Sequence, residues 1–565
     1  MSKQRSGTLT NPWLARAFTL AIACCAMNSR GNGNDQLALA EHDTAQWWQW
    51  QLNGERTQGT LPPHLLTPLG SLWKLFVFIY LVDTHQPEQK MLCDGQHSDE
   101  DRYCCEPQQS VDRSDALSRS CGRYFSPARL HIDPVTWRSY WSQRSAPEWL
   151  SDLHQLDEHQ LVTVTSLLQL LANIPAEPRQ QAKAALIGNN LQGRGRDALP
   201  TLGTLAIIKT FTQPLDGTRL GGGAGWTQND VPIWFSGLGN SQQVMHRLAP
   251  QLAKILLARR NADNSCVRVH FFARYPLQSV EDSQGKRLAA VTQPLAGHYT
   301  FTFTNGQQLT WQSGREPFWL EADSIGQLAL YGRLSETEYV ARVVDREGKA
   351  PSQQAAQALA VAARSYLYQH ARYQGECLSI DDTSALQRVS SLPASVAALS
   401  AARITSGLQL SAVTVQYHQH QGARNRLSWQ QALAWQEQGL DFVQILARAY
   451  PDAHLTWRGA EGHPECQPLQ EPAHWLKQQL ITWQSVLDTL PGYEAIALPQ
   501  ICLLHQGRPY ADQKAQRIYL RPATTLDSRI TLTHEYLHLA LAHHPAGADE
   551  TYIEQLARRL VRGEL

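Results

Sequence analysis

The stretch "ITLTHEYLHLALAHH", from Ile530 to His544, governs how the last part of the chain is interpreted. His534 and His538 are four residues apart, so a helix places both imidazoles on one face, one turn apart. Two ring nitrogens can then bind one metal ion, and Glu535 beside them can act as general base on water. Apolar residues on both sides of the motif predict that the helix is buried. The alternative is an ordinary packed helix whose histidines bind nothing.

This stretch resembles the His-Glu-x-x-His motif of the zincin metallopeptidases. Where the third ligand in that family is a glutamate, it comes from a following helix, and "GADETYIEQLARRL" supplies such a helix here. The resemblance implies a zinc site, one ion held by His534, His538 and Glu554, with Glu535 as the catalytic base. Other residues that offer a third ligand follow the motif closely: Glu550, His543 and His544.

Composition indicates a chain of several globular domains. Lys plus Arg and Asp plus Glu are equal at 50 each, which argues against a nucleic-acid-binding protein, because such proteins usually carry a basic excess. Charged residues make up 18% and hydrophobic residues 42% of the 565 residues, which is typical of folded domains with cores. The length predicts three or four domains.

The N-terminus is typical of an export signal. Positive charges precede the apolar segment 17–27, "AFTLAIACCAM", which is too short to span a bilayer. Residues 21–24 resemble a lipoprotein cleavage site, which implies a lipid anchor at Cys24, and Ala38-Leu39-Ala40 is an alternative cleavage site. We expect a leader over residues 1–40, a periplasmic protein and no transmembrane span in the mature chain. The alternative is a cytoplasmic protein.

Export would place the cysteines in an oxidising compartment, where disulfides form. Eight cysteines lie beyond the apolar segment, an even number: Cys93, Cys104, Cys105, Cys121, Cys266, Cys377, Cys466 and Cys502. The one local pair that we expect joins Cys93 to Cys104 or Cys105. The other pairings stay open.

Polar joints divide the rest of the chain into three regions, which together predict a multidomain α+β protein. Residues 41–275 mix helical stretches such as "LVTVTSLLQLLANI" with strand-like ones such as "TLAIIKTFTQ". Residues 277–458 begin with alternating strands around an Asn-Gly turn and continue into an alanine-rich helix, "SQQAAQALAVAARSYLYQHARYQ". Residues 468–565 combine helical stretches with a strand, "QRIYLRP".

In the first region, "PLGSLWKLFVF" carries Ser71 and Lys74, whose side chains share one face of a helix. A lysine with a lowered pKa can take the serine proton and activate the hydroxyl as a nucleophile. The alternative is a serine N-cap followed by a solvated lysine. The segment resembles the Ser-x-x-Lys motif of penicillin-binding proteins and serine β-lactamases.

Further segments resemble motifs of the same family in the same order. "ALSRSCGRYF" is similar to the Ser-x-Asn segment and places Ser120 at the serine. "AIIKTFT" is similar to the Lys-Thr-Gly strand, with Lys209 and Thr210 at its first two positions, and "IWFSGLG" (233–239) to the strand that pairs with it. The resemblance implies a penicillin-binding or β-lactamase-like fold in which the Ser-Lys pair is catalytic and the other three residues contact substrate.

Two residues depart from these motifs. Gly122 replaces the asparagine, which removes an amide that would hydrogen-bond substrate and lysine. Phe211 replaces the glycine, and we expect its ring to fill the space where a peptide would lie against the strand. We therefore expect the fold to be retained and the acyl-transfer site to be degenerate.

The middle region resembles the stage II sporulation protein D family, whose members cleave glycan strands of peptidoglycan or enhance amidases. The resemblance rests on "SETEYVARVVDREGKAPSQQAAQALAVAARSYLYQ" and "RLSWQQALAWQEQGLDFVQILARAYPDAHL". It places Glu347 at the catalytic glutamate, an acid that protonates the leaving oxygen if burial raises its pKa. The alternative is an exposed glutamate in a charged "DREGK" loop.

A metal-binding run of that family is altered here. Its Cys-Asp-Thr-x-His-Cys-Gln sequence corresponds to "DDTSALQ" (381–387), which keeps Asp382, Thr383 and Gln387 but has Ala385 at the histidine. Two nearby histidines, His418 and His420, are displaced from a second family element. We expect no metal site in this region.

The whole chain resembles a family of Gram-negative envelope proteins that joins these three modules. We expect an exported, zinc-dependent hydrolase acting on peptidoglycan or on an envelope polypeptide, with Glu347 adding glycan cleavage. An alternative is a non-catalytic peptidoglycan binder or amidase enhancer with eroded sites, which Gly122, Phe211 and Ala385 favour. A protease of an envelope protein is the third interpretation.

Overall fold

The computed structural model describes residues 34–564 with gaps, and divides into two compact units, Met1–Arg260 and Asn261–Leu565. The gaps are 42–43, 52–54, 94–103, 155, 157, 193–196, 216, 260–262, 264, 291–293, 315, 323–325, 349–352, 375–376, 419–422, 459–465, 467, 505–508, 513–515, 522–524, 543, 545–546 and 548. The apolar N-terminal segment and Cys24 lie outside the described residues. Within the described ranges, every helix is too short or too polar to cross a bilayer.

The first unit contains a six-stranded sheet in the order β3-β2-β1-β10-β9-β8. Its strands are β1 (Asp35–Glu41), β2 (Thr44–Trp50), β3 (Arg56–Thr60), β8 (Ala206–Leu215), β9 (Thr218–Thr227) and β10 (Pro232–Leu238). Strand β1 pairs with both β2 and β10, and Ala38 and Leu39 are fully buried in it. The folded part therefore begins before the expected residue 41, and cleavage after Ala40 would cut a central strand.

A hairpin provides the neighbour of the strand that carries Lys209. Strand β9 follows β8 after a short turn at Gly217, whose φ is +78°, and pairs Ala224 with Lys209. Strand β10 pairs with the other edge of β9. The prediction that residues 233–239 pair with the Lys209 strand is therefore wrong, because the turn returns the chain before β10 is reached.

Strand β9 is rich in glycine because its neighbours approach too closely for side chains. A Cβ at Gly225 would lie 2.2 Å from the carbonyl oxygen of Ile207. A Cβ at Gly221 would lie 2.5 Å from the carbonyl carbon of Asn240, at the start of helix α12 (Ser241–Ala258). These glycines let β8, β9 and the beginning of α12 form one tight wall.

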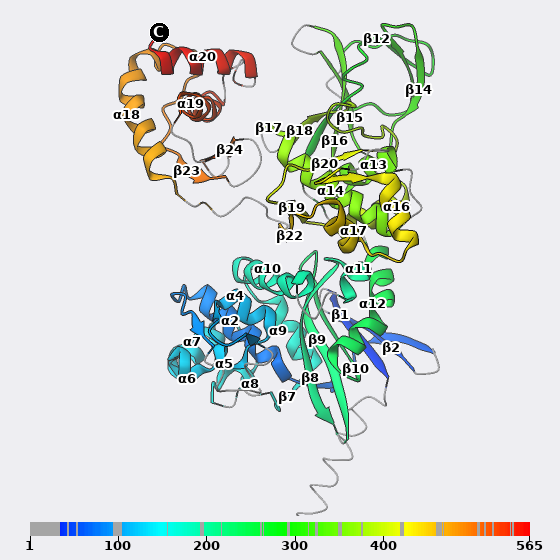
Figure 1. Cartoon of the computed structure of the whole chain (residues 1–565), viewed down its shortest axis with the longest axis vertical. Coiled ribbons are helices and arrows are strands. Elements are labelled where there is room, and N and C mark those ends of the chain that lie inside the picture. Colours follow the sequence, from blue (N-terminus) through cyan, green and yellow to red (C-terminus); the bar gives the residue numbers. More distant parts are fainter. Residues whose placement is uncertain are drawn as a thin grey trace, which may run out of the picture. The chain divides into compact units, whose positions relative to one another are not determined.

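The helices of the first unit gather mainly to one side of β8, β9 and β10 in Figure 1. Besides α12 they are α2 (Trp73–Asp83), α4 (Arg113–Arg119), α5 (Gly122–Phe125), α6 (Pro127–Leu130), α7 (Pro134–Gln143), α8 (Glu148–Ser151), α9 (Val164–Ala172), α10 (Ala176–Gln192), α11 (Leu199–Leu202) and the 3-10 turn η1 (Gly70–Leu72). Short strand pairs join β4 (Leu66–Pro68) to β7 (Leu161–Thr163) and β5 (Met91–Leu92) to β6 (Ser110–Val111). Helix α2 buries every residue from Lys74 to Val82, as its apolar run predicts.

The second unit begins with a sheet in the order β14-β13-β12-β16-β11-β18-β17, with β15 also paired to β16. Its strands are β11 (Val267–Phe271), β12 (Leu277–Asp282), β13 (His298–Phe303), β14 (Gln308–Gln312), β15 (Phe318–Ala322), β16 (Leu328–Leu334), β17 (Arg372–Gln374) and β18 (Cys377–Asp381). Strand β11 pairs with β16 and β18, so Val267–Phe271 belong to this sheet. We had expected the first region to extend to Tyr275, so that boundary was placed too late. The predicted Asn-Gly turn joins β13 to β14, with Gly306 at φ +81°.

The helices of this sheet domain are mostly buried. They are α13 (Glu336–Gly348), α14 (Gln353–His370), α15 (Val396–Ile404), α16 (Trp429–Glu437) and α17 (Phe442–Ala449). Two short strand pairs accompany them, β19 (Leu408–Ser411) with β22 (His454–Trp457) and β20 (Gln416–His418) with β21 (Arg426–Ser428). Small alanine side chains let the predicted helix α14 pack closely, and it is buried from Ala355 to Ser365.

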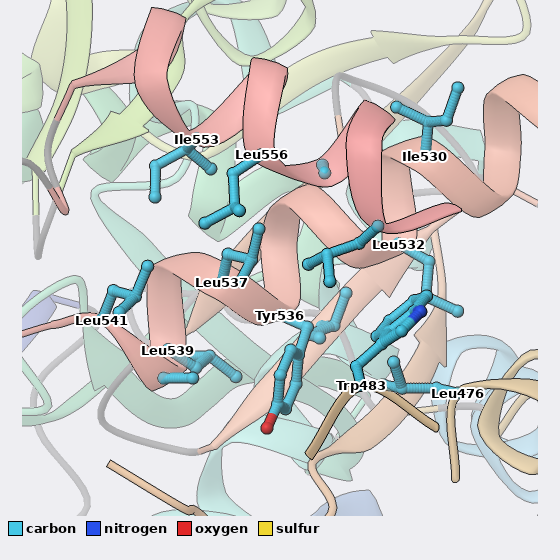
Figure 2. Close-up of a cluster of buried hydrophobic side chains, with 14 of the residues drawn as sticks. Leu476, Trp483, Ile530, Leu532, Tyr536, Leu537, Leu539, Leu541, Ile553 and Leu556 are labelled. Atoms are coloured by element: carbon cyan, nitrogen blue, oxygen red, sulfur yellow. The ribbon is translucent and has the colours of Figure 1, made fainter. Parts of the chain in front are cut away.

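The C-terminal part packs three helices around a small sheet. The helices are α18 (Gln470–Leu487), α19 (Leu526–Ala540) and α20 (Glu550–Arg562), and the strands are β23 (Gln500–Leu503), β24 (Tyr510–Asp512) and β25 (Arg517–Leu520). Figure 2 shows leucine and isoleucine side chains of α19 and α20 packed together, with Trp483 and Leu476 of α18 beside them. Thr525 caps the start of α19 and Asp549 that of α20, each by accepting backbone N–H groups.

All eight described cysteines form disulfides. The pairs are Cys93–Cys105, Cys104–Cys121, Cys266–Cys377 and Cys466–Cys502. The first confirms the expected local pair. The cluster of Cys93, Cys104 and Cys105 sulfurs, which has the spacing of a metal site, is explained by two disulfides that lie side by side.

We expect the substitution Arg342→Ala to destabilise the second unit strongly. The Arg342 side chain is fully buried and forms ion pairs of 2.6 Å with both Glu338 and Glu316. Removing one partner of a buried ionic cluster leaves uncompensated charge and costs about 3–5 kcal/mol. Denaturant unfolding of the full chain measures the loss.

The exposed pair of Arg424 and Asp452 supplies the control for this substitution. Arg424→Ala should leave the free energy of unfolding close to that of the parent, since solvent screens that pair. Equal losses in the two variants would contradict the role assigned to burial.

Candidate active sites

The two histidines of α19 and the first residue of α20 bring their ligand atoms together. The Nε2 atoms of His534 and His538 are 3.0 Å apart. Glu550 places Oε2 at 3.2 Å from His534 Nε2 and Oε1 at 3.6 Å from His538 Nε2. Among the described residues these side chains form a cluster in which one ligand atom from each lies within 4.8 Å of the others.

These separations fit a zinc ion. Zinc binds imidazole nitrogen and carboxylate oxygen at about 2.0–2.2 Å in a tetrahedron, which puts neighbouring ligand atoms about 3.3 Å apart. The observed distances of 3.0, 3.2 and 3.6 Å lie on both sides of that value. Without a cation, one of the two facing nitrogens must carry a proton, whereas a cation would accept both lone pairs.

Glu554 occupies a different place from the one predicted. Its Oε2 lies 3.0 Å from Nδ1 of His534, on the ring edge away from the nitrogen that faces His538. Arg558, one turn further along α20, donates from Nε and Nη2 to Oε1 of Glu554 at 2.8 and 2.7 Å. Glu550 therefore replaces Glu554 as the third candidate ligand, because it reaches the Nε2 side, and Glu554 orients the His534 ring.

The other ring is also held from behind. His538 Nδ1 lies 3.0 Å from the carbonyl oxygen of Gly547, a contact that directs Nε2 toward the cluster. His544 stacks on Tyr552 at 5.5 Å between ring centroids and is not part of the cluster. His543, the remaining predicted alternative, lies outside the described residues.

Glu535 lies beside the cluster and is almost completely buried. Burial raises its pKa to about 7, and the nearby Glu550 carboxylate adds to the increase, while His534 and the Ala511 backbone N–H oppose it. A cavity of about 660 Å³ opens here, and it is lined by Arg372, Pro509, Tyr510, Thr531, Thr551 and Gln555 in addition to the histidines, the glutamates and Arg558. A carboxyl group, two imidazoles and space for a ligand thus meet at one surface.

The charges of the cluster are coupled. Burial lowers the pKa of His534, but the hydrogen bond to Glu550 and the charges of three glutamates outweigh it, so the pKa is raised. Burial and the charge of His534 lower the pKa of His538. The contact with His534 lowers the pKa of Glu550. In the absence of a cation, Glu550 is thus an ionised partner of His534.

The first unit assembles a second site from the predicted serine and lysines. Lys74 donates to Ser71 Oγ at 3.4 Å and to the Ser120 carbonyl oxygen at 2.8 Å. Lys209 donates to Ser120 Oγ at 2.8 Å and to the Thr210 carbonyl oxygen at 3.0 Å. All five residues line a cavity of about 550 Å³. The residues that sequence motifs selected from three distant segments therefore meet at one place.

Lys209 lines this cavity and is almost completely buried. Burial lowers its pKa well below the ordinary value, and the nearby charge of Lys74 lowers it further. A lysine whose pKa is lowered is more often present as the neutral amine, the form that can accept a proton from a hydroxyl group. The sequence pattern gave the identity of this residue but not its environment.

Phe211 is one of the residues that line the cavity, but little of its ring is exposed there. Its side chain is 2% exposed, and its Cβ would lie 2.6 Å from a Cβ at Gly70, the residue before Ser71. The ring tip would lie 2.6 Å from a Cβ at Gly222 on β9. The phenyl group is therefore buried between two glycines, and the cavity beside Ser71 remains open. Gly122 begins helix α5.

Glu347 lies in the last turn of helix α13 and not in a charged loop. Its Oε1 accepts the backbone N–H of Arg388 at 3.0 Å. Burial raises the pKa of Glu347, and the charge of Asp382 contributes in the same direction. The interpretation as an exposed glutamate is therefore wrong, because α13 continues one turn further than the charged sequence suggested.

The altered run that contains Asp382 and Gln387 has a structural role. Asp382 accepts the backbone N–H of Val389 at 2.9 Å, and burial raises its pKa. Gln387 is fully buried and donates to the Tyr417 hydroxyl at 2.8 Å and to the Ala363 carbonyl at 3.0 Å. These retained polar residues hold the loop beside Glu347. His418 lies on β20, and His420 is outside the described residues.

Comparison with known proteins identifies relatives along nearly the full length. The chain is 41% identical to "Uncharacterized protein YfaQ" of Escherichia coli K12 over 532 residues, which cover 93% of this chain and 95% of the relative. Residues 96–207 and 425–546 also match the family described as "Predicted secreted protein (DUF2300)". The chain belongs to the DUF2300 family. Membership confirms the predicted export, and the matched segments contain Ser120 and the His534–His538 motif.

Part of the chain also resembles solved structures at low identity. The C-terminal domain of the Bacillus licheniformis BlaR penicillin-receptor is 14% identical, covering 40% of this chain and 89% of its own, with a TM-score of 0.27. The class D β-lactamase YbXI from Nostoc is 10% identical, covering 40% and 92%, with a TM-score of 0.28.

The environment of Glu347 predicts a pH-dependent gain from Glu347→Gln. Because burial raises the pKa of this carboxyl, the ionised form costs stability at neutral pH, and an amide that keeps the Arg388 contact removes this cost. The gain should be complete above the raised pKa and disappear below about pH 4, where both folded and unfolded glutamate are neutral.

Unfolding free energies at pH 7 and pH 4 measure the difference. Glu437→Gln, at an exposed position on α16, is the control and should change stability at neither pH. A gain of equal size at both pH values would show that the charge of Glu347 is not the cause.

Proposed function

We propose that this protein is an exported zinc-dependent hydrolase whose active site lies between α19 and α20. The observation that carries the proposal is the convergence of His534 Nε2, His538 Nε2 and the Glu550 carboxylate at separations suited to one ion. A helix with a purely structural role does not need two imidazole nitrogens that face each other and a carboxylate that faces both. Glu535 beside them, at a cavity, extends the site from metal binding to catalysis.

The roles of the side chains follow from their positions. His534, His538 and Glu550 would hold the zinc ion, which would polarise a carbonyl group and lower the pKa of water. Glu535 accepts a proton from the attacking water and delivers it to the leaving group. Glu554 and the Gly547 carbonyl keep the two imidazole rings in orientation from the opposite ring edge.

The proposed substrate is peptidoglycan or an envelope polypeptide. Export brings the chain into the compartment that contains both, and the sequence of the middle region resembles proteins that act on peptidoglycan. Glu347, half-buried and with a raised pKa, is the group that would protonate a glycosidic oxygen. In this proposal the middle region directs the hydrolase to the wall and adds glycan cleavage.

The metal is tested by elemental analysis and by chelator titration. We expect about one zinc per chain, lost in His534→Ala and Glu550→Ala. Glu554→Gln should retain zinc with an affinity lowered about 10–100-fold, because it disturbs only the orientation of a ligand. If Glu554→Gln loses the ion and Glu550→Ala keeps it, the ligand assignment is reversed.

Catalysis is tested with Glu535→Gln, which preserves the metal ligands. This variant should bind zinc as tightly as the parent and release peptide or muropeptide fragments about 10²–10⁴-fold more slowly. Release from purified peptidoglycan and from unfolded protein, with and without chelator, separates the substrates. Activity that survives both the chelator and Glu535→Gln would exclude this site as its source, and inertness on both substrates would favour a binder.

The first unit supports a second function, acyl transfer to Ser71. The supporting observation is the contact of Ser71 with Lys74. Lys74 and the buried Lys209 both donate hydrogen bonds to Ser120, and all of these residues line one cavity. In this reaction Ser71 Oγ bonds to an amide carbonyl carbon and the C–N bond breaks. The hydroxyl proton passes through the lysine to the departing nitrogen.

A fluorescent penicillin tests this second function directly. We expect slow covalent labelling of Ser71, detected by gel fluorescence and by mass spectrometry of the adduct, and its complete loss in Ser71→Ala. Ser118→Ala, at another serine lining the same cavity, should label at the parent rate. Labelling that persists in Ser71→Ala would remove Ser71 from this role.

A further inference from the structure

Ser120 connects the two lysines of the first unit. Its carbonyl oxygen accepts from Lys74 at 2.8 Å, and its hydroxyl oxygen accepts from Lys209 at 2.8 Å and lies 3.4 Å from Lys74 Nζ. Lys74 in turn reaches Ser71 at 3.4 Å. The position of one serine therefore sets the positions of both amines relative to the candidate nucleophile.

The backbone at Ser120 is in a conformation that a serine seldom adopts. Ser120 follows helix α4 as its C-cap, with φ +64° and ψ +41° in the left-handed region. Such a conformation is disfavoured for a residue that has a side chain, so the surroundings must hold it. The N–H of Cys121 bonds to the Ala116 carbonyl at 2.8 Å and closes the helix end.

A disulfide fixes the next residue. Cys121 is joined to Cys104, and their exposed fractions are 1% and 3%. Because Cys121 is adjacent to Ser120, the cross-link restrains the peptide that carries both lysine acceptors. The neighbouring disulfide, Cys93–Cys105, involves the residue next to Cys104, but neither of its cysteines is adjacent to Ser120 in the sequence.

We propose that the Cys104–Cys121 disulfide is a positioning element of the Ser71 site, and that the site becomes competent only after this bond forms. This inference rests on the proposed acyl-transfer function. Forming the bond joins the two sulfurs and passes two electrons and two protons to a disulfide oxidant in the compartment to which the chain is exported. In a reducing compartment both thiols persist, and Ser120 loses its restraint. Export would thereby activate the site.

A double-mutant cycle on the rate of penicillin labelling tests the proposal. Cys104→Ala with Cys121→Ala should slow acylation about 100-fold, as expected when catalytic groups shift by about 1 Å. Ser120→Ala should slow it as well. Adding the cysteine changes to Ser120→Ala should then slow acylation by clearly less than in the parent, because the hydroxyl contacts are already lost and only the contact of the Ser120 carbonyl with Lys74 is left to disturb. Cys93→Ala with Cys105→Ala, which removes the neighbouring disulfide, is the matched control and should stay within about threefold of the parent.

Two results would overturn the proposal. One is acylation at the parent rate without the Cys104–Cys121 bond. The other is a full additional loss when the bond is removed from Ser120→Ala, which indicates a general effect on folding. Hydrogen exchange in β8 and β9 reports whether the variants remain folded. If Cys104→Ala with Cys121→Ala does not fold, the combination Cys104→Val with Cys121→Ala is used in its place.

A second measurement decides the inference even if the parent protein takes no label. Acetic anhydride followed by mass spectrometry reports the accessibility of the Lys209 amine. We expect Lys209 to be protected in the parent and in the Cys93–Cys105 control, and to react at least tenfold faster without Cys104–Cys121. If Lys209 stays equally protected without the Cys104–Cys121 bond, the positioning role is refuted. If the parent takes no penicillin label but Lys209 reacts faster without the bond, only the acyl-transfer function is refuted.

Discussion

The packing of α20 against α19 is the constraint on which the candidate metal site depends. Ile553, Leu556, Ala557 and Leu560 form the buried stripe of α20, at helical spacing. Once that stripe is buried, the rotation of the helix about its axis is fixed. Glu550, Glu554 and Arg558, each four residues apart, must then face the edge of α19 where the histidines lie. Apolar burial, which carries no chemical specificity, thus selects the side chains that surround the imidazoles.

A similar dependence of polar groups on burial organises the first unit. Two amines approach a single serine because the strand behind Lys209 and the helix that carries Lys74 are both buried. In water, two ammonium groups would separate. Inside the protein, desolvation favours the neutral form of at least one of them, so that closeness and altered basicity arise together. The two candidate sites therefore share a physical origin although they use different side chains.

Much of both sites could be predicted from sequence, because helical spacing is a local property. The His534–His538 and Ser71–Lys74 pairs follow from separations of four and three residues on helices. The third ligand could not be chosen in this way. Glu550 and Glu554 differ by one turn, about 6 Å along the helix, and only the loop before α20 decides which one reaches Nε2. Arg558 could have been recognised, since it follows Glu554 at the spacing of a helical ion pair.

Other errors also arose where distant contacts override local sequence. The charged residues around Glu347 suggested a loop, yet Val343 and Val344 are buried and extend the helix through them. Phe211 was expected to obstruct a cavity, but two glycines from separate segments accommodate its ring. Disulfide partners beyond the local pair depend on the folded arrangement and are not encoded in spacing.

The glycines of β9 have a consequence for how this protein can diverge. At Gly221 and Gly225 the opposing backbone lies within the radius of a methyl group, so neither position can be adjusted independently. Any residue with a side chain would require β8 or the beginning of α12 to retreat at the same time. Asn240 and Ser241, at that helix start, also line the cavity beside Ser71. Folded variants of this wall therefore require simultaneous changes on β8, β9 and the beginning of α12. A mutant library that changes one residue at a time at these glycines will yield few folded proteins other than the parent.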